Sequence, residues 1–234
     1  DLPEFARIFE ETRRLGLARR DLLLRLQKSL RHAYVPAFYE VKYSADSKIA
    51  AFEAVMPGLP ERIRIKPLRD INAFGTEEVI SSPQTEMADM HLVEVNRGCF
   101  HNCRFCAASF IYRPARFRSY ERIISAIDRG LEKKNKIGLV GTAVSDHPEL
   151  ARICEYILAK KGQAGIGSLR IDQINETIIR LLKESGVETV SLAPEAGSQR
   201  LRDLLRKGIT QDDVMRSAEI LIENEIPNLR LYFM

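Results

Sequence analysis

The chain has 234 residues, of which 45% are hydrophobic and 29% are charged. This composition excludes a disordered chain and allows one large domain or two small ones. The 36 basic residues exceed the 32 acidic ones by only four, so the charge does not indicate a nucleic-acid partner, although it does not exclude one. No run of about 18 apolar residues occurs, and we therefore expect no membrane-spanning helix.

The cysteine pattern indicates the cellular compartment in which we expect the protein. Three of the four cysteines fall within eight residues, and the N-terminus lacks the apolar core of a secretory signal. Clustered thiols without such a signal indicate a metal site in a reducing cytosol, so we expect a cytoplasmic protein. Because the chain has no initiator Met and stops inside the apolar run LRLYFM, we also expect a piece of a longer protein.

The first part of the chain predicts helices and a hairpin. Residues 1–31 have helical apolar spacing, with Asp21 as the predicted N-cap of the leucine-rich half. Two apolar runs around the polar SADSK segment predict a β-hairpin over residues 37–55. Residues 62–66 predict a further strand, and residues 72–90 predict a linker.

From residue 91 onward, short apolar strands alternate with amphipathic helices. The predicted strands are 91–95, 136–141, 165–171, 187–194 and 228–234. The helices between them have predicted N-caps at Ser119, Asn175, Ser198 and Thr210. This alternation implies a parallel sheet with right-handed crossovers.

We therefore predict an α/β fold, a partial (β/α) barrel truncated after about five strands, with an N-terminal helical and hairpin extension. The predicted domains are residues 1–90 for the extension and residues 91–234 for the barrel core.

The segment VNRGCFHNCRFCAAS, which directly follows the first predicted strand of the core, holds the three clustered cysteines. Cys99, Cys103 and Cys106 form the pattern CxxxCxxC, and Gly98 allows a tight turn out of the strand. Three thiolates suit a 4Fe-4S cluster in which one iron has no protein ligand. That open iron can bind a cofactor or substrate and transfer an electron to it.

Two other uses of these thiols stay open. A zinc ion could be held by the three cysteines together with His101. A ferredoxin-like carrier would need a fourth cysteine, and Cys154 is the candidate. It shares an apolar helix face, however, and we expect it to be a buried core thiol.

The CxxxCxxC segment, with aromatic Phe105 before its last cysteine, resembles the radical S-adenosylmethionine (radical SAM) superfamily, and the resemblance covers residues 91–234. It implies a 4Fe-4S cluster on the three cysteines, with S-adenosylmethionine bound to the open iron. It also implies reductive cleavage of S-adenosylmethionine to a 5′-deoxyadenosyl radical. The substrate is unknown, and the reducing partner would be a protein such as flavodoxin or ferredoxin.

The resemblance marks further cofactor-binding positions at the ends of the later strands. Gly141 and Thr142 match the glycine-rich motif after the second strand, although its acidic residue is absent. Ser168 and Arg170 match polar positions near the cofactor carboxylate, and Glu195 matches the residue that meets the ribose or amino group.

Each of these assignments has a plainer alternative. Gly141 could form an ordinary turn, Arg170 could form a structural ion pair with Asp172, and Glu195 could be a surface acid. The arginine-rich segment 112–118 could cover the cluster or be an exposed connector.

Residues 94–119 resemble a branch of the superfamily with an upstream cobalamin-binding domain, and residues 33–43 resemble the connector that follows this domain. Several members of this branch are methyltransferases. No DxHxxG cobalamin motif occurs here, so the resemblance implies cobalamin for the full-length protein only. Methyl transfer or another radical modification is the expected reaction. The rival interpretations are a non-catalytic iron–sulfur or zinc-binding module and an inactive fragment.

Overall fold

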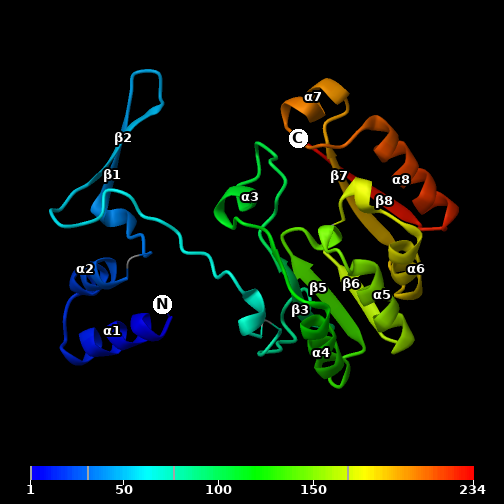
Figure 1. Ribbon diagram of the computed structural model, residues 1–234, viewed down its shortest axis with the longest axis horizontal. Coiled ribbons are helices and arrows are strands. Elements are labelled where there is room, and N and C mark those ends of the chain that lie inside the picture. The colour runs from blue at the N-terminus through cyan, green and yellow to red at the C-terminus, as the bar shows by residue number, and fades with distance from the viewer. Residues whose placement is uncertain (1, 31, 76, 168) are drawn as a thin grey trace. The chain divides into compact units, whose positions relative to one another are not determined.

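The computed structural model describes residues 2–30, 32–75, 77–167 and 169–234. The chain divides into two compact units, Asp1–Lys66 and Pro67–Met234, which are drawn in Figure 1 and described separately below. None of the helices in the described part of the chain is long and apolar enough to span a membrane.

The first unit contains the predicted helices and hairpin. Its elements are α1 (Leu2–Arg14), α2 (Arg19–Ser29), the short helix η1 (Pro36–Phe38), β1 (Tyr39–Tyr43) and β2 (Ile49–Ala54). The two strands pair antiparallel around the SADSK turn, as predicted. Ile8, Leu26 and Leu30 are buried together between the helices.

Two local predictions for this region are wrong. Helix α2 begins before Asp21, which lies in its first turn and accepts a hydrogen bond from the Ala18 backbone N–H at 3.2 Å. An acid three residues inside a helix can serve its first turn as well as an N-cap can, and spacing alone does not distinguish the two. Residues 62–66 are described throughout and form no strand.

The second unit alternates strands and helices. Its strands are β3 (Met90–Arg97), β4 (Arg116–Phe117), β5 (Lys136–Gly141), β6 (Gln163–Ile166), β7 (Thr189–Glu195) and β8 (Asn228–Phe233). Its α-helices are α3 (Ala108–Ile111), α4 (Tyr120–Leu131), α5 (Leu150–Ala159), α6 (Glu176–Glu184), α7 (Gln199–Leu204) and α8 (Gln211–Glu223). Short helices η2 (Ile71–Ala73), η3 (Val144–Asp146) and η4 (Ile171–Gln173) lie in the connections.

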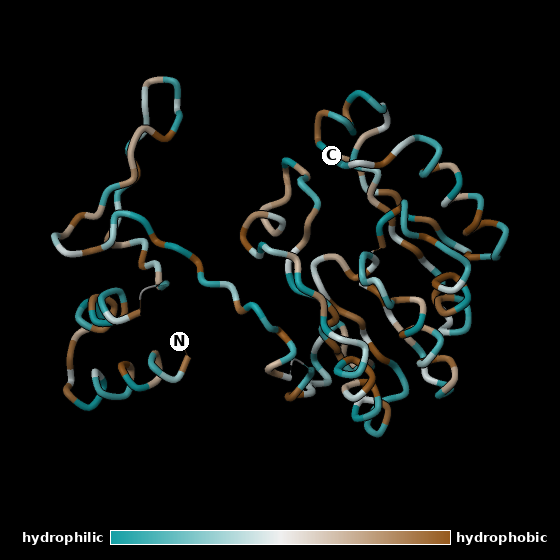
Figure 2. Tube along the Cα trace, viewed as in Figure 1, coloured by the Kyte–Doolittle hydropathy of each residue, from teal (hydrophilic) through white to brown (hydrophobic). Residues whose placement is uncertain are grey.

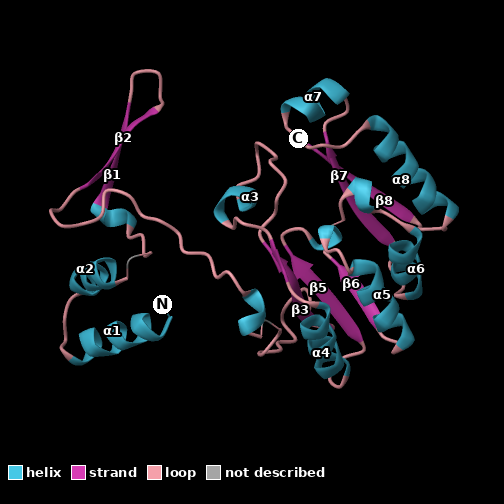
Figure 3. Cartoon of the chain, viewed as in Figure 1, coloured by secondary structure: helices cyan, strands magenta, loops and turns pink. Residues whose placement is uncertain are grey.

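The strands form two sheets, with orders β4-β3-β5-β6 and β7-β8. The β3–β5, β5–β6 and β7–β8 pairs are parallel, while the two-residue β4 pairs antiparallel with β3. Figure 3 shows the strands with helices between them, which confirms the α/β class. Within the described residues no ladder joins β6 to β7, so closure into a partial barrel stays a prediction.

The predicted strand 165–171 is too long. Strand β6 ends at Ile166, and Ile171–Gln173 forms the short helix η4 instead. Residue 168 lies outside the described residues. Arg170, which lies beyond the end of β6, lines the thiol cavity described below.

One continuous hydrophobic core holds the helices against the sheet. Valines and isoleucines of β3 and β5 pack with fully buried isoleucines of α4, α5 and α6. Brown segments recur along these helices in Figure 2. Cys154 is fully buried in this core, which confirms its interpretation as a core thiol.

The predicted caps fix where the helices begin. The side-chain oxygen of each cap residue accepts a backbone N–H three residues later, which satisfies a donor that would otherwise lack a partner. The four confirmed caps are Ser119, Asn175, Ser198 and Thr210.

Candidate functional site

The loop that carries the cysteines leaves β3 through a turn held by Asn96. Gly98 has φ +81°, and a Cβ there would collide with the Tyr112 carbonyl, so only glycine suits this position. The buried Asn96 carboxamide donates to the Gly98 carbonyl at 2.9 Å and accepts the Ala143 backbone N–H at 3.2 Å. Asn96 therefore joins the cysteine loop to the loop that follows β5.

The cysteine loop is held by its own hydrogen bonds and by one to a neighbouring turn. Cys99 and Cys103 are 8% and 7% exposed, while Cys106 is half-buried. The Cys106 backbone N–H donates to the Cys103 carbonyl at 3.2 Å. The Arg104 backbone N–H donates to the Leu205 carbonyl at 3.0 Å, which fastens the loop to the turn after α7.

Burial raises the pKa of the Cys99 and Cys103 thiols above the ordinary value. For Cys103, the nearby positive charges of Lys207 and Arg170 act in the opposite direction. Buried thiols of this kind need a positive partner, such as a metal ion, to be stable as thiolates.

The three thiols line one cavity of about 170 Å³ at the carboxyl ends of the parallel strands. Its other predicted residues are Phe105, Thr142 and Arg170, and its further lining includes His101, Ser145 and Lys207. Both basic groups therefore face the same space as the thiols. The carboxyl ends of parallel strands are where α/β folds bind ligands.

Gly141 and Thr142 lie where β5 ends. A Cβ on Gly141 would collide with the Asn96 carboxamide, so glycine is required by close packing rather than by a left-handed turn. Both residues line a larger cavity of about 740 Å³, which extends over Leu92 and Glu94 of β3. Thr142 also lines the thiol cavity, so it borders both cavities.

Arg170 forms the structural ion pair with Asp172 that was the alternative prediction. Its Nε lies 3.0 Å from Asp172 Oδ1 and 3.9 Å from Asp146 Oδ1. Its backbone N–H donates to Ser145 Oγ at 3.1 Å. Arg170 nevertheless lines the thiol cavity, so the ion pair holds the guanidinium beside the site. Its predicted neighbour Ser168 lies outside the described residues.

Glu195 is a buried residue and not a surface acid. It is 9% exposed and has φ +66°, a left-handed conformation that is strained for a glutamate. Its carboxylate accepts a hydrogen bond from Lys207 Nζ at 2.7 Å. Lys207 Nζ also lies 5.7 Å from the centre of the Phe105 ring, so the pair extends from β7 to the cysteine loop.

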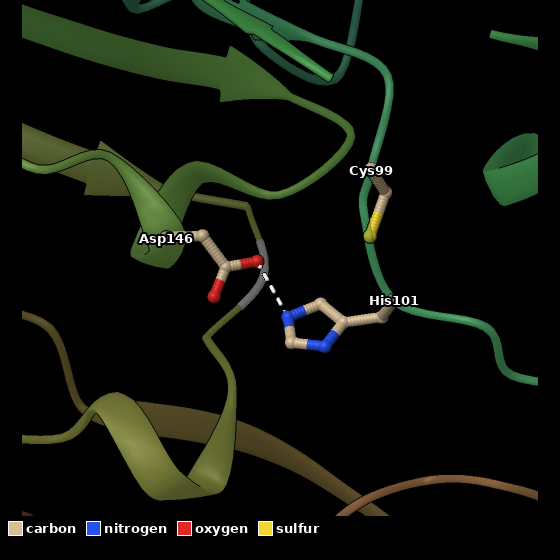
Figure 4. Close-up of side chains that lie close together, drawn as sticks. All are labelled: Cys99, His101 and Asp146. Carbon is tan, nitrogen blue, oxygen red and sulfur yellow. Dashed lines mark hydrogen bonds and ion pairs between the residues drawn. The ribbon is translucent and has the colours of Figure 1, made fainter. Parts of the chain in front are cut away.

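His101 lies between the first two cysteines and points toward the end of β5. Its Nε2 lies 2.9 Å from Oδ2 of Asp146, which is on η3, and the Asp146 side chain is 2% exposed. Figure 4 shows the Cys99 thiol beside this pair. The ligand atoms of Cys99, His101 and Asp146 all lie within 4.8 Å of one another.

The arginines of segment 112–118 divide between two places. Arg113 contacts the cysteine loop, where it donates to the Ser109 carbonyl at 2.6 Å and to the Asn102 carboxamide. The other two bind the chain elsewhere. Arg116 donates to the Leu68 carbonyl at 2.6 Å, and the buried Arg118 donates to the Phe74 carbonyl at 2.8 Å. Arg118 also pairs with Glu94 at 2.7 Å. These arginines attach the chain around residues 68–74 to the edge of the sheet.

Sequence reasoning missed three residues of this site: Asn96, Asp146 and Lys207. Asn96 lies near the end of β3, two residues before Gly98, and Asp146 lies in η3, in the loop after β5. Polar residues near the carboxyl end of a buried strand are a usable signal for both. Lys207 gives no such signal, because it follows α7 among other charged residues and reaches the site only through the fold.

Residues 93–234, more than half of the chain, match the model of the radical SAM superfamily. The chain belongs to this superfamily. The match spans all the strands from β3 to β8 and includes the cysteine loop.

Several known proteins are similar to this radical SAM chain. An uncharacterized protein of Methanocaldococcus jannaschii is 34% identical over 145 residues, 61% of this chain and 32% of the relative. The anaerobic magnesium-protoporphyrin IX monomethyl ester cyclase of Rubrivivax gelatinosus is 26% identical over 195 residues, 80% of this chain and 34% of the relative. The chain thus spans about a third of the length of these relatives.

Among solved structures, the radical SAM methyltransferase TsrM of Kitasatospora setae, with cobalamin and a [4Fe-4S] cluster bound, matches with a TM-score of 0.50. The match is 12% identical and covers 61% of this chain and 30% of that one. This similarity supports the fold of the radical SAM unit.

The donor set of this radical SAM chain fits an iron–sulfur cluster. Three thiols face one cavity, two of them are buried, and two basic groups lie nearby to balance the negative charge of thiolates. The three thiols are less closely gathered than the ligands of a single metal ion would be. Among the described residues, the group whose ligand atoms lie within 4.8 Å of one another is Cys99, His101 and Asp146, and it contains only one of the three thiols.

Proposed function

We propose that Cys99, Cys103 and Cys106 hold a 4Fe-4S cluster and that S-adenosylmethionine binds in the adjoining cavity. The observation that supports this most is that the three thiols, Arg170 and Lys207 line one space at the carboxyl ends of the parallel strands. When bound, the cluster would supply the electron for reductive cleavage of S-adenosylmethionine to a 5′-deoxyadenosyl radical.

The charges around the cavity suit the cofactor. S-adenosylmethionine carries a carboxylate, an ammonium group and a sulfonium, so its site needs groups of both signs. The Lys207–Glu195 pair offers an ammonium and a carboxylate 2.7 Å apart, and Arg170 offers a second cation. We propose that Lys207 and Arg170 meet the carboxylate and that Glu195 accepts hydrogen bonds from the amino group or the ribose.

Other predicted residues have passive roles in this proposal. The exposed Phe105 ring gives a flat surface for an aromatic base beside the last cysteine. Thr142, which lines the thiol cavity, and the neighbouring Gly141 would offer backbone groups to the amino group. Ser168 stays a prediction.

We also propose that β3, β5, β6, β7 and β8 are five consecutive strands of a partial barrel. In this series of five, each strand pairs in parallel with the next one, except that β6 and β7 do not pair. A small cavity lined by Ile166 and Val190 lies at that break.

For the reaction on the substrate, we propose only a reaction class. The cavity of about 740 Å³ beside Gly141 and Thr142 has the size of a small-molecule site. One similar protein is a cyclase and TsrM is a methyltransferase, so methyl transfer or another radical modification is proposed without a named substrate. A protein such as flavodoxin or ferredoxin would supply the electron, and cobalamin stays a prediction for a longer parent protein.

Anaerobic reconstitution with iron and sulfide tests the proposal. We expect the reduced protein to give the electron paramagnetic resonance signal of a 4Fe-4S cluster, and this signal should shift when S-adenosylmethionine is added. A cluster signal that ignores the cofactor would favour a non-catalytic module or an inactive fragment. Release of 5′-deoxyadenosine with reductant separates a working enzyme from both.

A further inference from the structure

We propose that the cluster-free chain binds one divalent transition-metal ion, of the Zn²⁺ or Fe²⁺ class, through Cys99, His101 and Asp146. These residues offer a thiolate, an imidazole and a carboxylate, the donor types that zinc uses in proteins. Within the described ranges, they form a group of three whose ligand atoms lie within 4.8 Å of one another (Figure 4).

The geometry needs little change to take an ion. His101 Nε2 and Asp146 Oδ2 are 2.9 Å apart, and tetrahedral zinc would hold a nitrogen and an oxygen ligand about 3.3 Å apart. The sulfur of Cys99 is already near both atoms and can approach through rotation of its side chain. The ion would displace the hydrogen that bridges Nε2 and Oδ2, and the neutral imidazole would then carry its proton on Nδ1, while the Cys99 thiol would release its proton to solvent.

The surroundings hold these ligands in place. The Asp146 side chain is buried on η3, and its other oxygen faces Arg170, with Oδ1 3.9 Å from the guanidinium Nε. Arg170 thereby turns Oδ2 toward His101, as an outer-shell partner orients a metal ligand. The positive charge of the Arg170 guanidinium would repel a bound cation. The Asp172 carboxylate, which accepts two hydrogen bonds from this guanidinium, offsets much of that charge. The His101 side chain is 21% exposed, which leaves a fourth position for water.

This site and the cluster exclude each other, because both use Cys99; this consequence rests on the proposed cluster. A single ion at Cys99, His101 and Asp146 would leave Cys103 and Cys106 without the third thiolate that a 4Fe-4S cluster needs. Zinc bound here should therefore delay cluster assembly, whereas Fe²⁺ would place the first iron beside Cys99.

Cobalt(II) titration of the iron-free chain, under argon, tests the mononuclear site. We expect one Co²⁺ per chain, with a thiolate-to-cobalt charge-transfer band and tetrahedral visible bands. Asp146→Asn and His101→Gln should each weaken Co²⁺ binding at least tenfold, and Cys106→Ser should leave it unchanged. Circular dichroism melting of each variant checks the fold.

Two results would overturn the proposal: no cobalt binding, or binding that survives Asp146→Asn and His101→Gln but is lost in Cys106→Ser, which would show a site made of thiols alone. The cluster is tested separately. Iron and sulfide should still load Asp146→Asn but not Cys106→Ser, so failure of the mononuclear site and failure of the cluster are distinguishable. Pre-loading with Zn²⁺ should slow cluster formation in the parent chain and not in Asp146→Asn.

Discussion

Lys207 Nζ lies 2.7 Å from Glu195 Oε1, and both side chains are close to nine-tenths buried. This pair connects the end of β7 to the cysteine loop, where the same ammonium lies 5.7 Å from the centre of the Phe105 ring. A lysine in this position is stabilised by one carboxylate and remains available to a second.

Lys207→Met should therefore weaken S-adenosylmethionine binding. A hydrogen bond to a charged group contributes about 1.5–3 kcal/mol, so we expect the dissociation constant to rise about 10- to 100-fold. Isothermal titration of the cluster-loaded protein measures this. The control is Lys183→Met, which removes an exposed lysine paired with Glu225 and should change nothing. Equal affinities of the two variants would rule out contact between Lys207 and the cofactor.

Cys103→Ala should abolish the broad visible absorbance of the reconstituted cluster, because two thiolates cannot replace three. Cys154→Ala should keep it. Cys154 is fully buried in the hydrophobic core, where burial raises its pKa to about 12, so it stays a thiol. We expect Cys154→Ala to lower the free energy of unfolding by about 1 kcal/mol through the small cavity that it creates. Loss of the cluster in the Cys154 variant would overturn the ligand assignment.

Much of this fold could be predicted from the sequence, because its information is local. Apolar periodicity marks the strands of the core, and cap residues such as Ser119 and Asn175 mark where helices begin. The prediction of Asp21 as the N-cap is wrong for a local reason too, since an acidic residue suits several positions in the first turn of a helix. The strand at 165–171 was overextended because an apolar run does not tell where a strand leaves its sheet.

The site could be predicted only where a motif marks it. The spacing of Cys99, Cys103 and Cys106 is such a motif, whereas Asp146 and Lys207 are ordinary charged residues until the fold brings them to the cavity. For Arg170, the sequence could not decide between two roles. The structure shows that one position of the side chain allows both, the ion pair with Asp172 and a place beside the cofactor cavity.

Gly141→Ala should destabilise the site by crowding it. The added methyl group would collide with the Asn96 carboxamide, which links the loops after β3 and β5. Overpacking of this kind costs about 1–3 kcal/mol, so the melting temperature should fall and cluster loading should drop with it. Gly167→Ala is a matched control, because a Cβ there meets nothing within 4 Å. If both variants melt alike, Gly141 is not constrained by Asn96.

His147 should make stability depend on pH. It is 4% exposed, its Nε2 lies 2.9 Å from the Arg118 carbonyl, and its Nδ1 accepts the Glu149 backbone N–H at 3.1 Å. This arrangement requires the neutral ring, with the proton on Nε2, and burial lowers the pKa of His147 below its ordinary value of 6.5.

Because the folded-state pKa is the lower one, the unfolded chain takes up the proton first as the pH falls. The stabilisation is therefore complete above about pH 6.5 and decreases as the pH falls toward the lowered pKa. Urea unfolding at a series of pH values from 8 to 5 measures this, with His147→Gln for comparison. Glutamine can donate and accept at similar positions but does not titrate, so its profile should be flatter than that of the parent chain. Parallel profiles would show that another group controls the acid sensitivity.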